Sequence, residues 1–296
     1  MSGRYASVDI GTNTAKLLIA ESREGVLHPL FQRAEAPRVG RNVAATGRIS
    51  EEAFAALEAV LRSYAADILA HQATLAGAIA TQAFRMAANG PGLLEKIPAI
   101  LGCEARLIGG PEEARLGWLA VANLYRRADL AVLDIGGGST EATRKGHCVS
   151  TPIGAVTLLE ARGPSPAACR EGAAEAFSHI GPDWRSGTAL AAVGGTAIAL
   201  AMLELGLDRY DAAAIEGLEV ARERVTAQID RLAGMPADAL AALPGMGSGR
   251  VDIVVPGLCI LEAFLIRAGL DRTLISDRGI RYGLLVDWLR RRAQTA

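Results

Sequence analysis

Two short segments of the sequence each combine a carboxylate with a glycine turn. They are DIGTNTAK, residues 9–16, and DIGGGSTE, residues 134–141, and each follows an apolar stretch typical of a buried strand. Glycine allows the backbone to approach a ligand closely, and successive N–H groups in such a turn form an anion-binding concavity. A carboxylate beside a phosphate suits Mg²⁺, which proteins hold through one or two carboxylates and phosphate oxygens. The pair therefore indicates a phosphate and metal site, although an Asp-Gly turn can also serve only as a loop.

The side chains of these segments have separate expected roles. Asp9 and Asp134 end their strands and are the predicted metal carboxylates, together with Glu141. The predicted phosphate-binding residues are Thr12, Asn13, Thr14 and Lys16 in the first segment and Gly136, Gly137, Gly138 and Ser139 in the second. A third glycine turn holds Gly195 and Thr196 between an expected strand and helix. The first amides of that helix can bind an anion, or the glycines can simply allow tight packing.

A general base is expected near the start of another helix. Glu112 and Glu113 follow Gly109-Gly110-Pro111, and acidic residues there also suit the helix dipole alone. Two in a row leave one carboxylate available to take a proton from water attacking a phosphoryl group. Arg85 follows a buried strand and is expected to reach substrate oxygens.

The elements that must position these residues mix strands with helices, which predicts an α/β protein. Strands are expected at residues 4–10, 15–21, 26–33, 75–81, 104–108, 130–135, 139–144 and 147–152. Helices are expected at residues 50–70, 82–89, 112–125, 154–161, 194–206, 215–232 and 279–292, with loops at 162–168 and 234–249.

The two glycine segments form an internal repeat. They align without a gap, share Asp, Ile and Gly at their first three positions, and lie one domain length apart. We interpret them as the openings of two related domains, residues 1–124 and 125–296, with both turns facing one interdomain cleft. The last helix can pack back on the first domain. A chance resemblance between two hairpin turns is the alternative.

Composition narrows the function classes. The net charge is −1, which favours neither a nucleic-acid partner nor an anionic membrane surface. The four cysteines lack metal-ligand spacing, and the N-terminus lacks the pattern of a signal peptide. We expect a cytoplasmic protein with no membrane partner.

At these residues the sequence resembles the exopolyphosphatase / guanosine pentaphosphate phosphatase family, part of the superfamily of acetate and sugar kinases and actin. The matching stretches, in chain order, are VDIGTNTAKLLIAE, RVGRNVAATGRISEEA, TQAFRMAAN, GGPEEARLGWLAV, LDIGGGSTE, PIGAVTLLE, AVGGTAIALA, RVDIVVPGLCILEAF and SDRGIRYGLL. GPEEARL together with DIGGGSTE is the most specific of them.

The resemblance implies two actin-like (ribonuclease H-like) domains and release of terminal phosphate from inorganic polyphosphate. It implies Mg²⁺, with Mn²⁺ as a substitute, and a homodimer as a plausible assembly. By motif position the family's catalytic base falls on Glu113, its second catalytic carboxylate on Glu141 and its motif arginine on Arg85. Arg38 and Arg41 are further basic residues that could grip a polyanion.

Two departures from the family pattern stand out. The usual glycine-containing RLGxG reads RVGRN here, with Arg41 and Asn42 at its fourth and fifth positions. The sequence also stops soon after SDRGIRYGLL, whereas longer members carry a helical HD-type domain and a further domain, so it resembles a short, two-domain member.

Three alternatives stay open. A guanosine pentaphosphate phosphatase would share the site, but aromatic residues make up only 4% of the sequence and offer little base-stacking surface. A superfamily kinase would need an adenosine pocket, which AVGGTAIALA could border. A non-catalytic sensor of a phosphorylated signal is disfavoured because both Glu113 and Glu141 are present.

Overall fold

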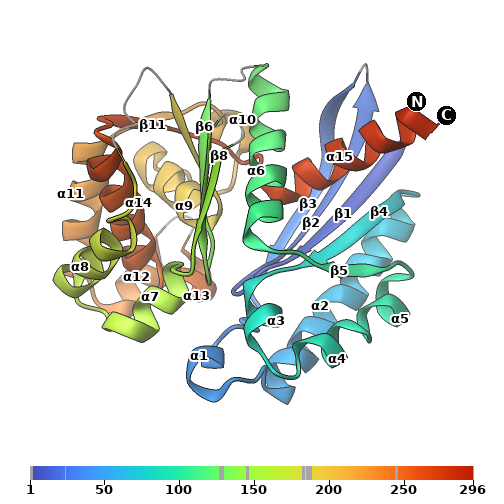
Figure 1. Cartoon of the computed structure of the whole chain (residues 1–296), viewed down its shortest axis with the longest axis horizontal. Helices are drawn as coiled ribbons and strands as arrows, with labels where there is room; N and C mark the ends of the chain where they lie inside the picture. The colour runs from blue at the N-terminus through green and yellow to red at the C-terminus, as the bar shows by residue number, and fades with distance from the viewer. Residues whose placement is uncertain are drawn as a thin grey trace. The chain divides into compact units, whose positions relative to one another are not determined.

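The computed structural model describes residues 3–23, 25–126, 130–144, 147–181, 184, 189–243 and 246–295. It divides into two units (Figure 1). The first unit comprises Met1–Arg127 and Arg278–Ala296, and the second comprises Ala128–Asp277. The first unit is therefore discontinuous in sequence, and its last helix follows the whole of the second unit.

The first unit is built on a five-stranded mixed sheet of order β3-β2-β1-β4-β5. Its strands are β1 (Arg4–Ile10), β2 (Ala15–Arg23), β3 (Val26–Glu35), β4 (Thr74–Ala80) and β5 (Ala105–Leu107). The first three form an antiparallel meander, and β4 and β5 run parallel to β1. The ends of β1, β4 and β5 therefore lie along one edge.

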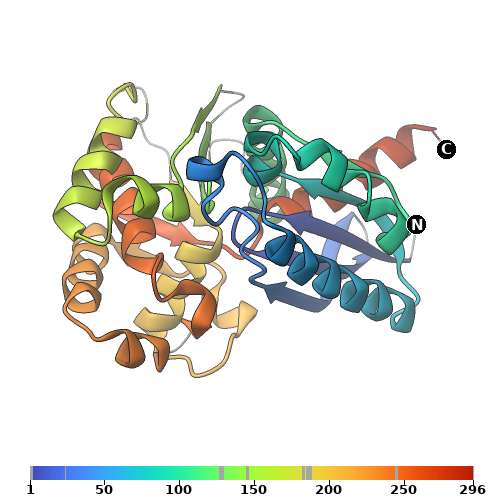
Figure 2. The same cartoon turned by 90° about the horizontal axis from the view of Figure 1, so that it is seen from below.

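Helices cover both faces of this sheet. They are α1 (Val43–Thr46), α2 (Glu51–Ala70), α3 (Gln82–Met86), α4 (Gly90–Leu94), α5 (Ile97–Leu101), α6 (Gly110–Tyr125) and α15 (Ile280–Thr295). Successive strand residues point to opposite faces, so Leu17 and Ile19 share a cluster with α2 whereas Leu18 shares one with α6 and α15. Figure 2 shows α2 running across its face of the sheet.

The second unit holds a six-stranded sheet of order β10-β11-β9-β6-β7-β8. Its strands are β6 (Ala131–Ile135), β7 (Thr140–Arg144), β8 (His147–Thr151), β9 (Leu190–Val193), β10 (Glu219–Ala221) and β11 (Arg272–Ile275). Its helices are α7 (Ala155–Arg162), α8 (Pro166–Ala176), α9 (Gly195–Leu205), α10 (Ala212–Ile215), α11 (Arg222–Ala233), α12 (Ala237–Ala241), α13 (Gly247–Arg250) and α14 (Val254–Ala268).

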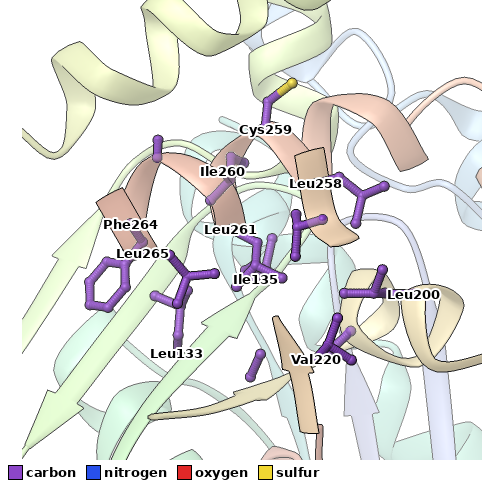
Figure 3. Packing of buried hydrophobic residues seen from close by; sticks show 14 of the residues in the cluster. Leu133, Ile135, Leu200, Val220, Leu258, Cys259, Ile260, Leu261, Phe264 and Leu265 are labelled. Atoms are coloured by element: carbon purple, nitrogen blue, oxygen red, sulfur yellow. The ribbon is translucent and has the colours of Figure 1, made fainter. Parts of the chain in front are cut away.

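The core of the second unit centres on α14. This helix buries residues on nearly all of its faces. Figure 3 shows its Leu261 and Leu265 beside Leu133 and Ile135 of β6, within one hydrophobic cluster. The helix therefore fixes β6, the strand that leads into the second glycine turn.

The two sheets share one topology. In each, an antiparallel three-stranded meander is followed by a strand parallel to its first member and then by a further parallel strand: β1–β2–β3, β4, β5 and β6–β7–β8, β9, β11. The glycine turns join the first two strands of each meander. The predicted α/β class is confirmed, and the internal repeat of the sequence corresponds to two sheets of the same topology.

Three local expectations were wrong. The helix expected at 215–232 begins only at Arg222, after the end of α10 and the strand β10, because Gly217 takes a φ of 83° that a right-handed helix does not accommodate. The loop expected at 162–168 contains the start of α8, where Pro166 occupies a first-turn position that suits proline. The loop expected at 234–249 contains α12 and α13.

The final helix belongs to the first unit. α15 packs along α6, and a Cβ atom at Gly283 would lie 1.9 Å from the carbonyl oxygen of Leu116. The sequence-based division at 124/125 assigned this helix to the second domain while allowing it to pack on the first. Among the described residues, no helix is long and apolar enough to cross a membrane.

Candidate active site

The first glycine turn is held by its own backbone. The N–H of Gly11 donates to the carbonyl of Thr14 at 3.1 Å, and a Cβ atom at Gly11 would lie 3.0 Å from that same oxygen. Thr12 and Asn13 are buried, and Asn13 Nδ2 donates to Thr14 Oγ1 at 3.3 Å. The sequence therefore needs glycine at this point to close the turn between β1 and β2.

Backbone N–H groups of the RVGRN segment, residues 38–42, donate hydrogen bonds to this turn. Gly40 N–H donates to the Thr12 carbonyl at 2.8 Å, and Arg38 N–H donates to the Asn13 carbonyl at 3.1 Å. A Cβ atom at Gly40 would lie 2.1 Å from Thr12 Cγ2. Asn42, which stands where the family pattern has glycine, has a φ of 59°. Asparagine is among the few residues that adopt this left-handed conformation readily, and glycine adopts it freely.

Asp9 presents a buried carboxylate oxygen to the start of the first turn. Within the described residues, its Oδ1 atom is buried without a hydrogen-bond partner. Burial raises the pKa of Asp9, and the positive charges of Lys16 and Arg281 oppose that rise. Lys16 lies directly opposite Asp9 in the β1–β2 ladder, on the same face. A carboxylate oxygen left without a partner fits the role of a metal ligand.

The second turn has the same backbone hydrogen bond as the first. Gly136 N–H donates to the Ser139 carbonyl at 3.0 Å. The start of α7 then packs on the turn: Val156 N–H donates to the Gly137 carbonyl at 2.8 Å, and a Cβ atom at Gly154 would lie 2.5 Å from the Gly137 carbonyl carbon. The repeat recognised in the sequence is thus reproduced at the level of single hydrogen bonds.

Two carboxylates share one face beside the second turn. Asp134 and Glu141 lie opposite each other in the β6–β7 ladder, and both are buried. Ser150 Oγ donates to Glu141 at 2.8 Å. Like charges directly opposite each other repel, so a bound divalent cation would lower the free energy of this pair.

The donor set fits Mg²⁺ better than a metal that needs a full protein cage. In the part of the chain that the structure describes, no three His, Cys, Asp or Glu residues cluster closely enough to hold a metal. Mg²⁺ needs only one or two carboxylates, because water and phosphate oxygens complete its coordination. The paired Asp134 and Glu141 meet that requirement, and so does Asp9 with its unpartnered oxygen.

The third glycine turn lies beside Asp134. Gly194 has a φ of 94°, and a Cβ atom there would lie 2.9 Å from Asp134 Oδ1. Gly195 opens α9, and Thr196 is buried against Gly257. The structure therefore brings the third turn together with the second, within one unit.

One cation at the third turn was missed by sequence reasoning. The guanidinium of Arg250 lies beside Gly195, where a Cβ atom would be 3.6 Å from Arg250 Nη2. Burial lowers the pKa of Arg250, and the carboxylate of Asp277 opposes that change. Its signal was available, since Arg250 opens the RVDIVVPGLCILEAF stretch, but an isolated arginine before an apolar run carries no chemistry by itself.

Glu113 is the buried member of the acidic pair. It lies in the first turn of α6 with 4% of its surface exposed, and its carboxylate pairs with Arg85. Glu112 instead pairs at the surface with Arg106, at 3.1 Å. The structure thus separates a surface carboxylate from one held inside the first unit.

Arg85 is engaged by the protein itself. Its guanidinium donates to Glu113, to the carbonyl of Ile108 and to Gln82. Its contacts in this structure therefore hold Glu113 in place, whereas the sequence suggested contact with substrate oxygens. Thr81, which precedes α3, donates through its N–H to the Ile10 carbonyl at 3.2 Å. The carboxyl ends of β1, β4 and β5 thus gather Asp9, Arg85 and Glu113 at one edge of the sheet, where open α/β sheets bind ligands.

Known proteins resemble this chain over most of its length. The sequence profile of the Ppx/GppA phosphatase family matches residues 18–292. Exopolyphosphatase 2 of Mycobacterium tuberculosis (strain CDC 1551 / Oshkosh) is 31% identical over 309 residues, which cover 95% of this chain and 97% of that protein.

Solved structures match over nearly the whole length. The crystal structure of the Aquifex aeolicus member of the Ppx/GppA family is 26% identical, with a TM-score of 0.82 and 99% of each chain covered. An exopolyphosphatase-like protein is also 26% identical, with a TM-score of 0.88 and the same coverage. With profile, sequence and structure matching across both units, the chain belongs to the Ppx/GppA phosphatase family.

Proposed function

We propose that this protein is an exopolyphosphatase, which hydrolyses the terminal phosphate of inorganic polyphosphate in a Mg²⁺-dependent reaction. The observation that carries the proposal is Glu113, a buried carboxylate fixed by Arg85 at the sheet edge that also holds the first anion-binding turn. The name of the Mycobacterium tuberculosis relative, exopolyphosphatase 2, supports the same substrate.

Catalysis of phosphoryl transfer depends on positioning the reactants and neutralising phosphate charge more than on covalent chemistry by the protein. Glu113 accepts a proton from the attacking water, and Arg85 keeps its carboxylate in one orientation. The amides and hydroxyls of Thr12–Thr14 and Gly136–Ser139 bind phosphate oxygens, with Gly195, Thr196 and Lys16 as further contacts. Glu141 assists by orienting the water.

Mg²⁺, or Mn²⁺ in its place, supplies neutralisation of phosphate charge when bound. In the second unit Asp134 and Glu141 would hold it, and in the first unit the buried Oδ1 atom of Asp9 is a separate candidate ligand. Removing divalent cations with a chelator is expected to abolish phosphate release.

The test is phosphate release from tripolyphosphate and from long-chain polyphosphate, with Glu113→Gln compared with the native protein. Loss of a general base costs on the order of a hundredfold or more. Glu112→Gln is the matched control, because Glu112 is the adjacent residue in the same helix turn and pairs with Arg106 at the surface. We expect its activity to stay within about twofold of native, since exposed pairs contribute little.

Equal losses in both variants would remove the role assigned to Glu113. A native protein that releases no phosphate from either polymer would overturn the substrate assignment. Guanosine pentaphosphate and ATP would then be the substrates to test, in that order.

A further inference from the structure

One segment of the first unit is positively charged and carries no acid. Residues 36–50, APRVGRNVAATGRIS, contain Arg38, Arg41 and Arg48 and lie between Glu35 and Glu51. We call this stretch the arginine segment. The whole chain has a net charge of −1, so such a run is a local feature rather than a reflection of overall composition.

The arginine segment begins at the phosphate-binding turn. Its Gly40 and Arg38 N–H groups donate to the carbonyls of Thr12 and Asn13. Arg41 follows directly, and its own N–H donates to the Arg38 carbonyl at 3.0 Å. Arg41 therefore lies in a tight turn, and the preceding residue, Gly40, is hydrogen-bonded to Thr12.

The far end of the segment is also fixed. Ile49 N–H donates to Asn89 Oδ1 at 3.0 Å, and Asn89 Nδ2 donates to the Ile49 carbonyl at 2.9 Å. Ala88 N–H donates to the Gly47 carbonyl at 2.8 Å. Figure 1 shows α1, the middle of the segment, next to α3, the helix that carries Arg85. The backbone that carries Arg41 and Arg48 is thus hydrogen-bonded to the rest of the unit at both ends of the segment.

Arg41 and Arg48 differ from the ion-paired arginines of the unit in their surroundings. Both are exposed, and within the described ranges neither forms an ion pair. By contrast, Arg33 is held by Asp67 at 2.8 Å and Arg115 by Asp287 at 2.7 Å. The arginine segment therefore presents two exposed cations on a fixed backbone, and it contains no carboxylate. This combination suits binding of a polyanion.

We propose that the arginine segment is a track for the polyphosphate chain, binding phosphate groups that follow the terminal one. This inference rests on the proposed function, because it supposes that the terminal phosphate occupies the Thr12–Thr14 turn. The track gives the protein a preference for long chains over short ones. Tripolyphosphate has too few groups to occupy both the turn and the far end of the track.

The experiment compares kcat/KM on tripolyphosphate with kcat/KM on long-chain polyphosphate. The test variant is Arg41→Gln/Arg48→Gln. The control is Arg62→Gln, an exposed arginine on α2 in the same unit but outside the segment. A charge-keeping variant, Arg41→Lys/Arg48→Lys, separates the charge of the side chains from their shape.

We expect the long-to-short ratio of kcat/KM to fall roughly five- to thirtyfold in Arg41→Gln/Arg48→Gln, since each exposed charge contact contributes up to about fivefold. The fall should come from KM, and it should be smaller in the lysine variant. The KM for the long chain should also depend less steeply on salt. An equal loss on both substrates, no loss, or the same loss in Arg62→Gln would overturn the proposal.

A binding measurement keeps this inference distinct from the proposed function. Calorimetric titration of long-chain polyphosphate into Glu113→Gln, with and without the two Arg→Gln changes, reports binding without turnover. If the native protein hydrolyses neither polymer, the exopolyphosphatase assignment fails. Weaker binding by the arginine variant would still establish the track as a polyanion site, and unchanged binding would remove it.

Discussion

Asp9 and Asp134 occupy the same place in the internal repeat but face residues of opposite charge. Lys16 lies across the ladder from Asp9, whereas Glu141 lies across from Asp134. The first turn therefore sets a carboxylate against a cation across the ladder, and the second sets a carboxylate against a carboxylate. Carboxylates facing each other at the second turn suit a divalent cation, and the lysine opposite Asp9 at the first turn suits a phosphate.

Asp9→Asn is expected to stabilise the folded protein. Burial raises the pKa of Asp9 in the folded state, so ionisation there costs free energy that the unfolded chain does not lose. The variant should gain about 1.4 kcal/mol for each pH unit by which that pKa is raised. The gain should be present at neutral pH and should vanish as the pH falls below about 4, where the carboxyl is protonated in both states.

Urea unfolding at neutral and at acidic pH measures this difference. Asp208→Asn, at an exposed position in the second unit, serves as the control and should not alter the pH dependence. A less stable Asp9→Asn at neutral pH would contradict the account. The same variant should lose phosphate release, a trade between stability and activity that is common at functional sites.

At the residue scale, the sequence analysis identified candidate site residues better than it identified the residues that they contact. It placed Glu113 at a helix start, but burial alone separates it from Glu112, and burial depends on how α6 packs. Arg85 was located correctly after its strand, yet its contact with Glu113 joins positions 28 residues apart and no local pattern encodes it. Arg250 was missed because only the fold brings it beside Gly195.

At the scale of elements, the RVGRN segment shows how asparagine can occupy a left-handed position before a helix. Asn42 takes the left-handed conformation usually assigned to glycine and marks the start of α1. The hydrogen bonds from Gly40 and Arg38 to the first turn are made with asparagine at this position.

Asn42→Ala and Asn42→Gly should differ in stability. Alanine in a left-handed conformation costs about 1–2 kcal/mol, whereas glycine adopts it freely. We expect Asn42→Ala to lower the unfolding free energy by about 1 kcal/mol, and Asn42→Gly to lower it by less. Urea unfolding of both proteins measures the difference, and equal losses would show that backbone strain does not govern this position.

The long helix α2, which has a clear period and a cap, was predictable, and the buried helix α14 was not. α2 begins at Ser50, whose side chain accepts from the Ala53 N–H, and its apolar residues repeat along one face. α14 is buried nearly all round, so its sequence shows no amphipathic period and the sequence analysis assigned no helix there. The break at Gly217 depends on a backbone conformation that composition alone does not specify.

At the scale of the whole molecule, the duplicated topology was predictable because both copies begin with the same short segment. The sequence analysis allowed α15 to pack on the first unit but did not assign it there, because its packing partner α6 lies more than 150 residues earlier in the chain. The close approach of these helices is what ties them together: the α carbon of Gly283 faces the backbone of Leu116 with no room for a side chain.

Gly283→Ala should therefore destabilise the first unit strongly. Its new methyl group would lie 1.9 Å from a backbone oxygen, so α15 and α6 must separate, at a cost of about 3 kcal/mol. Gly279→Ala is the matched control, because nothing lies within 4 Å of a Cβ atom at that position. Thermal unfolding of the two variants measures the effect, and similar melting temperatures would refute the close packing.

The placement of α15 also bears on how the chain is made. A ribosome completes every residue of the second unit before it reaches Tyr282, Leu285 and Val286, which fill the core between α15 and the first sheet. Domains usually fold in the order of synthesis. Here the N-terminal unit waits for α15 with that face of its sheet covered by α6 alone, so the part that begins first is the part that finishes last.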